Sequence, residues 1–324
     1  MNSASKPVTY NSETISMKKG IGNKFIDDFD KRFKAIPELK LKIKRVVELS
    51  KEKNKKPLII SFASEKGGCG KSTMAVTTSQ LLANMGFKVQ LIDVDNNESA
   101  YRMLISRKKN IQEVINNAVK EGVDESLIID FKTKLDPLVD TALVDKESLT
   151  VDLVNEIATD SAYDIIVFDT PGVKEKREEN FDLAKLNHAG EVHMILAYLS
   201  NSIVIPMRVT PLDITIATRL IYPLSQFVDH LEKMKLAVLK TQARILVNSI
   251  DQRTGTALNA LEEFQNSSYK QFKTIIRRSD KIAFAPYFEG VQTAFTTKVA
   301  SQMQESFLEV IDQISDDAMV SLGE

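Results

Sequence analysis

Residues 58–73 read LIISFASEKGGCGKST. The apolar run 58–63 predicts a buried strand, and the glycines after it let the backbone curl so that several N–H groups point toward an anion. A helix is predicted over about 72–85, with its positive end at the same point. Lys71 is placed to reach the β- and γ-phosphates of a nucleotide, and the Ser72 hydroxyl to bind Mg²⁺. We name residues 66–73 the phosphate loop.

The phosphate loop departs from the common pattern G-x-x-x-x-G-K-[ST], because Glu65 stands where the first glycine would be. The pattern that matches is K-G-G-x-G-K-[ST], which carries a second lysine, Lys66, at the front of the loop. Five segments follow: a strand ending in D-x-D at 88–95, DIIVFDTPG at 164–172, IVIPM at 203–207, ILVNSID at 245–251 and AFAPYFEG at 283–290. In this order, from about 58 to 295, they resemble the ParA/MinD family of ATPases, whose phosphate loop is called a deviant Walker A motif.

The resemblance implies an α/β fold: a doubly wound, mostly parallel sheet flanked by helices, of the P-loop NTPase type. We expect this ATPase domain over 58–324, after a disordered basic tail over 1–22 and a basic helical extension over 23–57. Between the D-x-D strand and the strand at 164–169 the sequence predicts only helices, at 98–105, 110–120, 126–141 and 148–159.

Three aspartates end predicted strands at one edge of the sheet, where ligands of open α/β sheets bind. Asp169 is placed to hold Mg²⁺ through water, and Asp93 to support the metal shell with Ser72. The resemblance gives Asp95 the role of orienting the water that attacks ATP. Each aspartate has a plainer alternative as a helix N-cap. The family's P-Q-G-[SN] after D-x-D is replaced here by Asn96-Asn97-Glu98-Ser99, so the surroundings of that water are expected to differ from those in the family.

The second lysine of the loop has the largest consequence for function. By the resemblance, Lys66 reaches across a two-fold axis to the phosphates of the partner's nucleotide, so that ATP becomes part of a homodimer interface. The alternative is a solvated lysine beside Glu65. The resemblance implies catalytic roles for Lys66, Lys71 and Asp95, and an adenine contact for Asn248. It implies further nucleotide contacts for Gly67, Gly68, Cys69, Gly70, Lys71, Ser72, Thr73 and Pro286.

The composition agrees with a cytoplasmic protein. The chain has 324 residues, of which 43% are hydrophobic, enough for one large α/β domain with an appendage. No apolar run approaches the roughly 18 residues that span a bilayer, and the N-terminus lacks the apolar region of a secretory signal. The single cysteine, Cys69, excludes a disulfide framework and is expected to pack in the loop.

Charge is distributed unevenly along the chain. Residues 1–57 hold 15 Lys and Arg against 7 Asp and Glu, whereas the whole chain has a net charge of −1. The basic extension is read as helices that dock on the core or the partner subunit, with direct contact to nucleic acid or a membrane surface as alternatives. Arg277, Arg278 and Lys281 match the region where DNA-binding family members carry a basic patch, and non-specific binding needs only such residues.

We therefore expect an ATPase that hydrolyses ATP to ADP and phosphate with Mg²⁺ and forms a homodimer when ATP is bound. Plasmid or chromosome partition is the expected role, with non-specific DNA as the surface, a ParB-like centromere-binding protein as partner, and association with the nucleoid. No membrane contact is expected, because the segment after Lys298 is acidic, whereas a MinD-type anchor needs basic residues. The alternatives are a MinD-like or other cargo-positioning ATPase, an ATP-dependent synthase on the same scaffold, and a DNA-binding regulator.

Overall fold

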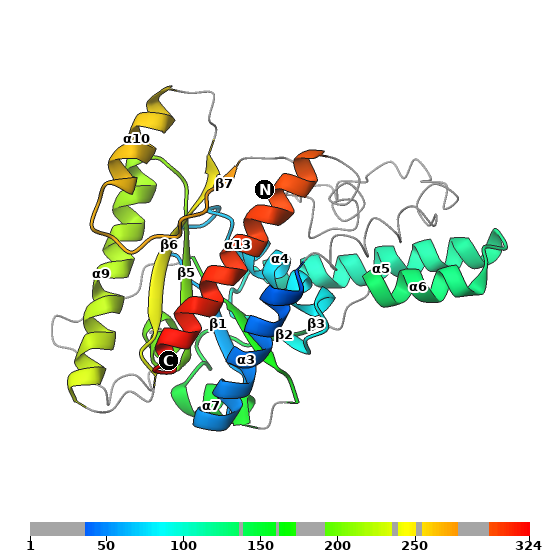
Figure 1. The fold of residues 1–324 in the computed structure, drawn as a ribbon, viewed down its shortest axis with the longest axis horizontal. Coiled ribbons are helices and arrows are strands. Elements are labelled where there is room, and N and C mark those ends of the chain that lie inside the picture. The colour runs from blue at the N-terminus through cyan, green and yellow to red at the C-terminus, as the bar shows by residue number, and fades with distance from the viewer. Residues whose placement is uncertain are drawn as a thin grey trace, which may run out of the picture.

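The chain forms a parallel sheet covered by helices on both faces (Figure 1). The computed structural model describes residues 36–135, 139–159, 162–172, 192–234, 239–250, 255–277 and 298–324. Within these residues seven strands pair in the order β3-β2-β4-β1-β5-β6-β7, and every pairing is parallel. Their bounds are β1 Leu58–Phe62, β2 Val89–Asp93, β3 Val139–Leu143, β4 Ile165–Asp169, β5 Ser202–Met207, β6 Gln242–Ile250 and β7 Ile276–Arg277. The predicted α/β class is confirmed.

Successive residues of a strand face opposite sides of the sheet, and the central strands are apolar at nearly every position. Both faces of the sheet are therefore apolar. In β1, Leu58 and Ile60 join one hydrophobic cluster and Ile59 joins the other. The first cluster takes in residues of α3 (Pro37–Asn54), α4 (Lys71–Asn84), α5 (Ser99–Lys120) and α13 (Lys298–Ser321). The second takes in residues of α7 (Val151–Thr159), α8 (Val192–Leu199), α9 (Pro211–Lys233) and α10 (Gly255–Gln265).

The region between β2 and β4 differs from the sequence prediction. The helix predicted over 126–141 is too long: α6 spans Glu125–Leu135, and Val139–Leu143 is strand β3, paired with β2 along its whole length. Pro137 disfavours a continuing helix, and β-branched residues at 139 and 141 favour a strand. The segments predicted at 98–105 and 110–120 form one helix, α5, which lies beside α6, and the two project from the sheet (Figure 1).

The described part of the basic extension is packed into the domain. Helix α3 begins with Pro37 at its first turn and lies beside α13 (Figure 1). Its apolar face, including Ile43, Val46 and Leu49, is buried in the same cluster as the sheet. On its polar face, Lys42 contacts Asp312 at 2.7 Å and Asp316 at 2.6 Å, and Lys53 contacts Glu324 at 2.6 Å. Several of its lysines are therefore paired with acidic groups of the same chain, which favours docking over contact with nucleic acid.

The strand order brings three chain segments to one edge of the sheet. Register pairs Phe62 with Asp169 and Asp93 with Asp169, so the carboxyl ends of β1, β2 and β4 lie at one level. The phosphate loop follows β1 directly and leads into α4. This edge therefore holds the candidate functional residues.

Some predictions concern residues outside the described part of the chain. These are the tail over 1–22, the extension before residue 36, and the segment 278–297, which includes Arg278, Lys281 and Pro286. No helix in the described part is long and apolar enough to cross a membrane.

The docking of α3 predicts a difference between two leucines of the same helix. Leu49 is 3% exposed and Leu41 is 65% exposed. Leu49→Ala should lower the free energy of unfolding by about 2–5 kcal/mol, because it leaves a cavity in the core. Leu41→Ala, the matched control, should change it by no more than about 0.5 kcal/mol. Urea unfolding measures both, and equal small effects would contradict the packing of α3.

Candidate nucleotide-binding site

The phosphate loop has the backbone that its glycines predict. Gly68 has φ of +76° and Gly70 has φ of +95°, a region that side chains disfavour. A Cβ on Gly70 would lie 2.3 Å from Nδ2 of Asn248, so this position also needs glycine for space. Helix α4 begins at Lys71, and no described side chain caps its first N–H groups. Such a helix start, behind a curled loop, is suited to bind an anion.

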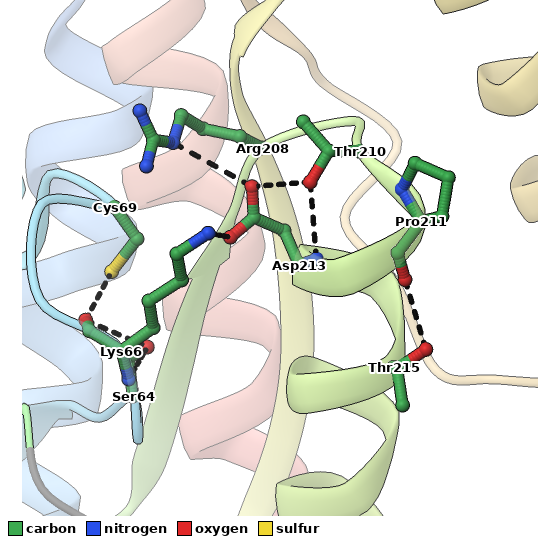
Figure 2. Close-up of polar contacts among 8 residues, drawn as sticks. All are labelled: Ser64, Lys66, Cys69, Arg208, Thr210, Pro211, Asp213 and Thr215. Atoms are coloured by element: carbon green, nitrogen blue, oxygen red, sulfur yellow. Dashed lines mark hydrogen bonds and ion pairs between the residues drawn. The ribbon is translucent and has the colours of Figure 1, made fainter.

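Short polar contacts hold the phosphate loop in place. The Lys66 backbone N–H donates to Oγ of Ser64 at 3.1 Å, and the buried Cys69 thiol donates to the Lys66 carbonyl oxygen at 3.4 Å (Figure 2). From β6, the buried amide of Asn248 donates to the Cys69 carbonyl oxygen at 2.8 Å. Sequence reasoning assigned Asn248 only an adenine contact and missed this one. The available signal was a polar residue within the apolar strand segment ILVNSID.

Asp169 is a buried carboxylate at the end of β4. Within the described residues neither of its oxygens has a hydrogen-bond partner of normal geometry. Burial raises the pKa of Asp169 to about 7, although the charge of Lys71 and the nearby Ser72 hydroxyl act in the opposite direction. A buried carboxylate with no partner of normal geometry in the described part of the chain, beside a serine hydroxyl, is an oxygen donor set that suits Mg²⁺. The residues present therefore fit the metal that the sequence predicts.

The two other aspartates differ in what they contact. Asp93 is buried, and its oxygens accept the backbone N–H of Asp95 at 2.9 Å and of Tyr101 at 3.0 Å. Burial raises the pKa of Asp93 while these N–H groups lower it. Asp93 thus shapes the loop after β2 and the start of α5, although the N-cap residue of α5 is Glu98, and its place in a metal shell remains a prediction.

Asp95 is held by a residue that departs from the family pattern. Its Oδ1 accepts both the backbone N–H of Asn97 at 3.1 Å and the Asn97 side-chain amide at 3.0 Å. Sequence reasoning noted the unusual Asn96-Asn97 pair but did not predict that it binds Asp95. The geometry leaves Asp95 partly exposed at the same edge as Asp169, and its charge acts on Asp169.

The loop after β4 touches the phosphate loop. A Cβ on Gly172 would lie 3.0 Å from the Gly67 nitrogen, so glycine permits a close approach of the two loops. The preceding Thr170 shares a hydrogen bond of 3.1 Å with Nε2 of His193, a buried residue in the first turn of α8. Nothing in the local sequence connects His193 with this loop.

The two lysines of the phosphate loop have different surroundings. Lys71 is buried and close enough to Asp169 to affect its ionisation. Lys66 reaches away from the loop to form an ion pair with Asp213 in the first turn of α9 (Figure 2). Arg208 approaches the same carboxylate at 3.7 Å. The alternative of a solvated lysine beside Glu65 did not anticipate this ion pair, and the predicted contact with the partner's nucleotide stays a prediction.

Sequence reasoning missed Asp213, although a local signal was present. Thr210 and Asp213 stand three residues apart before an apolar run, which is the spacing of a helix capping motif. Oγ1 of Thr210 accepts the Asp213 backbone N–H at 3.1 Å and donates to Oδ2 of Asp213 at 2.7 Å. The motif predicts a helix start, but it carries no sign that Lys66 would join it.

Of the three basic residues predicted to contact DNA, the structure describes one. Arg277 is exposed on β7, the last strand of the sheet order, away from the strands that carry the aspartates. Its neighbour Ile276 pairs with Asn248 of β6, whose side-chain amide contacts the phosphate loop, so β7 lies on the Asn248 side of the site.

The chain is similar to several known proteins, among them one curated relative and two solved structures. A curated relative, the sporulation initiation inhibitor protein Soj of Bacillus subtilis, is 24% identical over 240 residues, covering 70% of this chain and 87% of Soj. A solved structure of a putative plasmid partition protein from Borrelia burgdorferi bound to AMPPNP is 21% identical, with a TM-score of 0.48 over 79% of this chain and 98% of that one. The MinD cell division protein of Aquifex aeolicus is 22% identical, with a TM-score of 0.43 over 82% of this chain and 98% of that one.

The family assignment rests on a match of a different kind. The family model of the CobQ/CobB/MinD/ParA nucleotide binding domain matches residues 60–290, which is more than half of the chain. The matched range includes the phosphate loop, all three aspartates and Asn248. The chain therefore belongs to the CobQ/CobB/MinD/ParA nucleotide-binding domain family.

Proposed function

We propose that this protein is an ATPase that dimerises when ATP is bound and serves DNA partition. The observation that carries the proposal is that the two lysines of the phosphate loop point to different places. Lys71 is buried next to Asp169, whereas Lys66 points away from the loop toward α9. A lysine that is not directed at its own phosphate site can serve the phosphates of a second subunit once it leaves Asp213.

Nucleotide binding is assigned to the phosphate loop. Its N–H groups and Lys71 would hold the β- and γ-phosphates, and phosphoryl transfer depends mainly on such positioning and charge. Ser72 and Asp169 would hold Mg²⁺, which supplies positive charge against the phosphates when it is bound. Gly67, Gly68, Cys69, Gly70 and Thr73 complete the proposed contacts, with Asn248 supporting the loop from β6.

Hydrolysis needs a group that places water in line with the γ-phosphate. We assign this role to Asp95, which lies at the same edge of the sheet as Asp169. The water oxygen attacks the γ-phosphorus, the bond to the ADP oxygen breaks, and the products are ADP, phosphate and a proton. Asn97 fixes Oδ1 of Asp95 through two hydrogen bonds, so it contributes to the position of that carboxylate.

Partition is favoured over positioning at a membrane by the last helix. The apolar face of α13, including Val310, Ile314 and Ala318, is buried against the sheet. That face is therefore not free to enter a membrane interface, as an amphipathic anchor requires. We propose non-specific DNA as the surface, bound through Arg277, Arg278 and Lys281, and a ParB-like protein as partner. Association with the nucleoid would follow from the DNA contact.

An ATP-dependent synthase is the alternative function within this family, and two features distinguish it from a dimerising ATPase. A synthase on this scaffold needs a second site for its small-molecule substrate and has no need of Lys66. The pairing of Lys66 with Asp213, on an element outside the phosphate loop, favours the dimerising ATPase.

Lys71→Ala should raise the dissociation constant for ATP at least about a hundredfold, because each charge-assisted hydrogen bond that is removed is worth about 1.5–3 kcal/mol. Isothermal calorimetry with Mg²⁺-ATP measures the change. Lys88→Ala is the matched control, since Lys88 is exposed at the opposite end of β2. Near-normal ATP affinity in the Lys71 variant would rule out the assigned loop.

Asp95→Ala should preserve ATP binding and lower the hydrolysis rate by about 10²–10⁴-fold, the range for a group that assists proton transfer or water placement. Phosphate release under saturating ATP measures the rate. Glu98→Gln removes a nearby carboxylate charge that pairs with Arg102 and should leave turnover within about twofold. Wild-type turnover in the Asp95 variant would mean that another group orients the water.

The double variant Arg278→Ala, Lys281→Ala should bind duplex DNA more weakly in the ATP-bound state. The loss of affinity should be the same for duplexes of unrelated sequence. The slope of log K against log salt should fall by about 0.9 for each DNA phosphate that is no longer neutralised. Lys40→Ala combined with Lys44→Ala is the control, because both lysines are exposed on α3. Anisotropy titrations at several salt concentrations measure the slopes. If only the control variant binds DNA more weakly, the DNA-binding residues lie on α3. If the wild-type protein does not bind duplex DNA at low salt, DNA is not the surface on which this protein acts.

A further inference from the structure

Three side chains lie close to the carboxylate of Asp213. Its side chain is 2% exposed and forms an ion pair with Lys66 of the phosphate loop. Oδ2 accepts the Thr210 hydroxyl at 2.7 Å, and Nε of Arg208 lies 3.7 Å from the same oxygen (Figure 2). A distance of 3.7 Å is within ion-pair range but too long for a hydrogen bond. Lys66 is thus the cation in direct contact, and Arg208 is a second cation within reach.

A buried carboxylate needs a cation nearby. Removing one partner of a buried ion pair leaves an uncompensated charge, which is strongly unfavourable. If Lys66 leaves Asp213 for a nucleotide, another positive group must compensate. Arg208 suits this task, because its side chain is 41% exposed and therefore has room to move. It follows β5 directly and stands five residues before Asp213, so a rotation of its side chain is enough to close the gap.

We propose that Asp213 holds Lys66 within its own subunit in the nucleotide-free protein, and that Arg208 replaces Lys66 on Asp213 when the ATP-bound dimer forms. This inference rests on the proposed function, since it requires Lys66 to act on the partner's nucleotide. Asp213 and Arg208 are positioning residues in this scheme, because neither touches the phosphates. They set how readily Lys66 becomes available.

The exchange leaves the start of α9 intact. Asp213 lies in the first turn of α9, where a negative charge interacts favourably with the helix dipole. Its backbone contact with Thr210 does not involve either cation. Exchanging Lys66 for Arg208 therefore changes which element is tied to α9 while the helix cap remains. The phosphate loop is released from α9 at the moment the dimer assembles.

Substitutions at the two positioning residues should have opposite effects on dimerisation. If Lys66 is free in about one molecule in ten, Asp213→Asn releases it in both subunits and tightens the dimer dissociation constant by about a hundredfold. Arg208→Gln should weaken the dimer by about tenfold or more, because Asp213 then has no replacement cation. In the double variant, Arg208→Gln should have no further effect, since the buried charge is gone.

Sedimentation equilibrium with Mg²⁺ and AMPPNP measures the dissociation constants. Asp229→Asn is the matched control, because it removes an exposed aspartate from the same helix and should change the constant by less than about twofold. Lys66→Ala tests the proposed function itself and should abolish the dimer. Arg208→Gln changes a partly exposed side chain, so the proposal stays testable even if Asp213→Asn fails to fold.

A second readout does not depend on the dimer. Acetic anhydride labelling of nucleotide-free protein, followed by mass spectrometry, should modify Lys66 several-fold faster in Asp213→Asn than in wild type. A dimer that requires Lys66 but is unchanged by Asp213→Asn and Arg208→Gln would overturn this inference alone. A dimer that does not require Lys66, or no dimer from wild type, would overturn the proposed function and this inference together.

Discussion

The buried carboxylate of Asp169 is the constraint around which the site is arranged. A parallel sheet places the carboxyl ends of β1, β2 and β4 at one edge, and the strand order sets Asp169 between the phosphate loop and Asp93. Burial without a hydrogen-bond partner among the described residues raises the pKa of Asp169 to about 7. A cation bound at this edge would offset the Asp169 charge, which is the place that we propose for the metal.

The phosphate loop is tied to three elements that lie far apart in the sequence. Asn248 on β6 holds its Cys69 carbonyl, Gly172 after β4 permits a close approach to Gly67, and Asp213 on α9 holds Lys66. A shift of this loop on nucleotide binding would therefore act on contacts with β6, with the segment after β4 and with α9. This arrangement provides a physical route by which the state of the nucleotide could alter the surface near α9.

Much of this architecture could be predicted from the sequence. Apolar strand segments, the glycine pattern of the loop and the aspartates at strand ends are local signals. Through the family resemblance that they carry, they predicted the parallel sheet and its ligand edge. The helix predicted over 126–141 was wrong at its end, since β3 gains its stability from pairing with β2, which lies far from it in sequence. The contacts of Asn248 with Cys69 and of Asp213 with Lys66 were missed for a related reason, because each joins residues far apart in the sequence. The contact of Asn97 with Asp95 is local, but the sequence offers several possible partners for an asparagine in this loop.

The switch proposed for this protein is a change of partner by Lys66 when ATP is bound. A crystal structure of the protein with Mg²⁺ and AMPPNP tests it most directly. We predict a two-fold dimer in which Nζ of Lys66 contacts the phosphates of the partner subunit's nucleotide and Asp213 is paired with Arg208. A nucleotide-bound structure in which Lys66 remains on Asp213 of its own subunit, or contacts its own nucleotide, would contradict the switch.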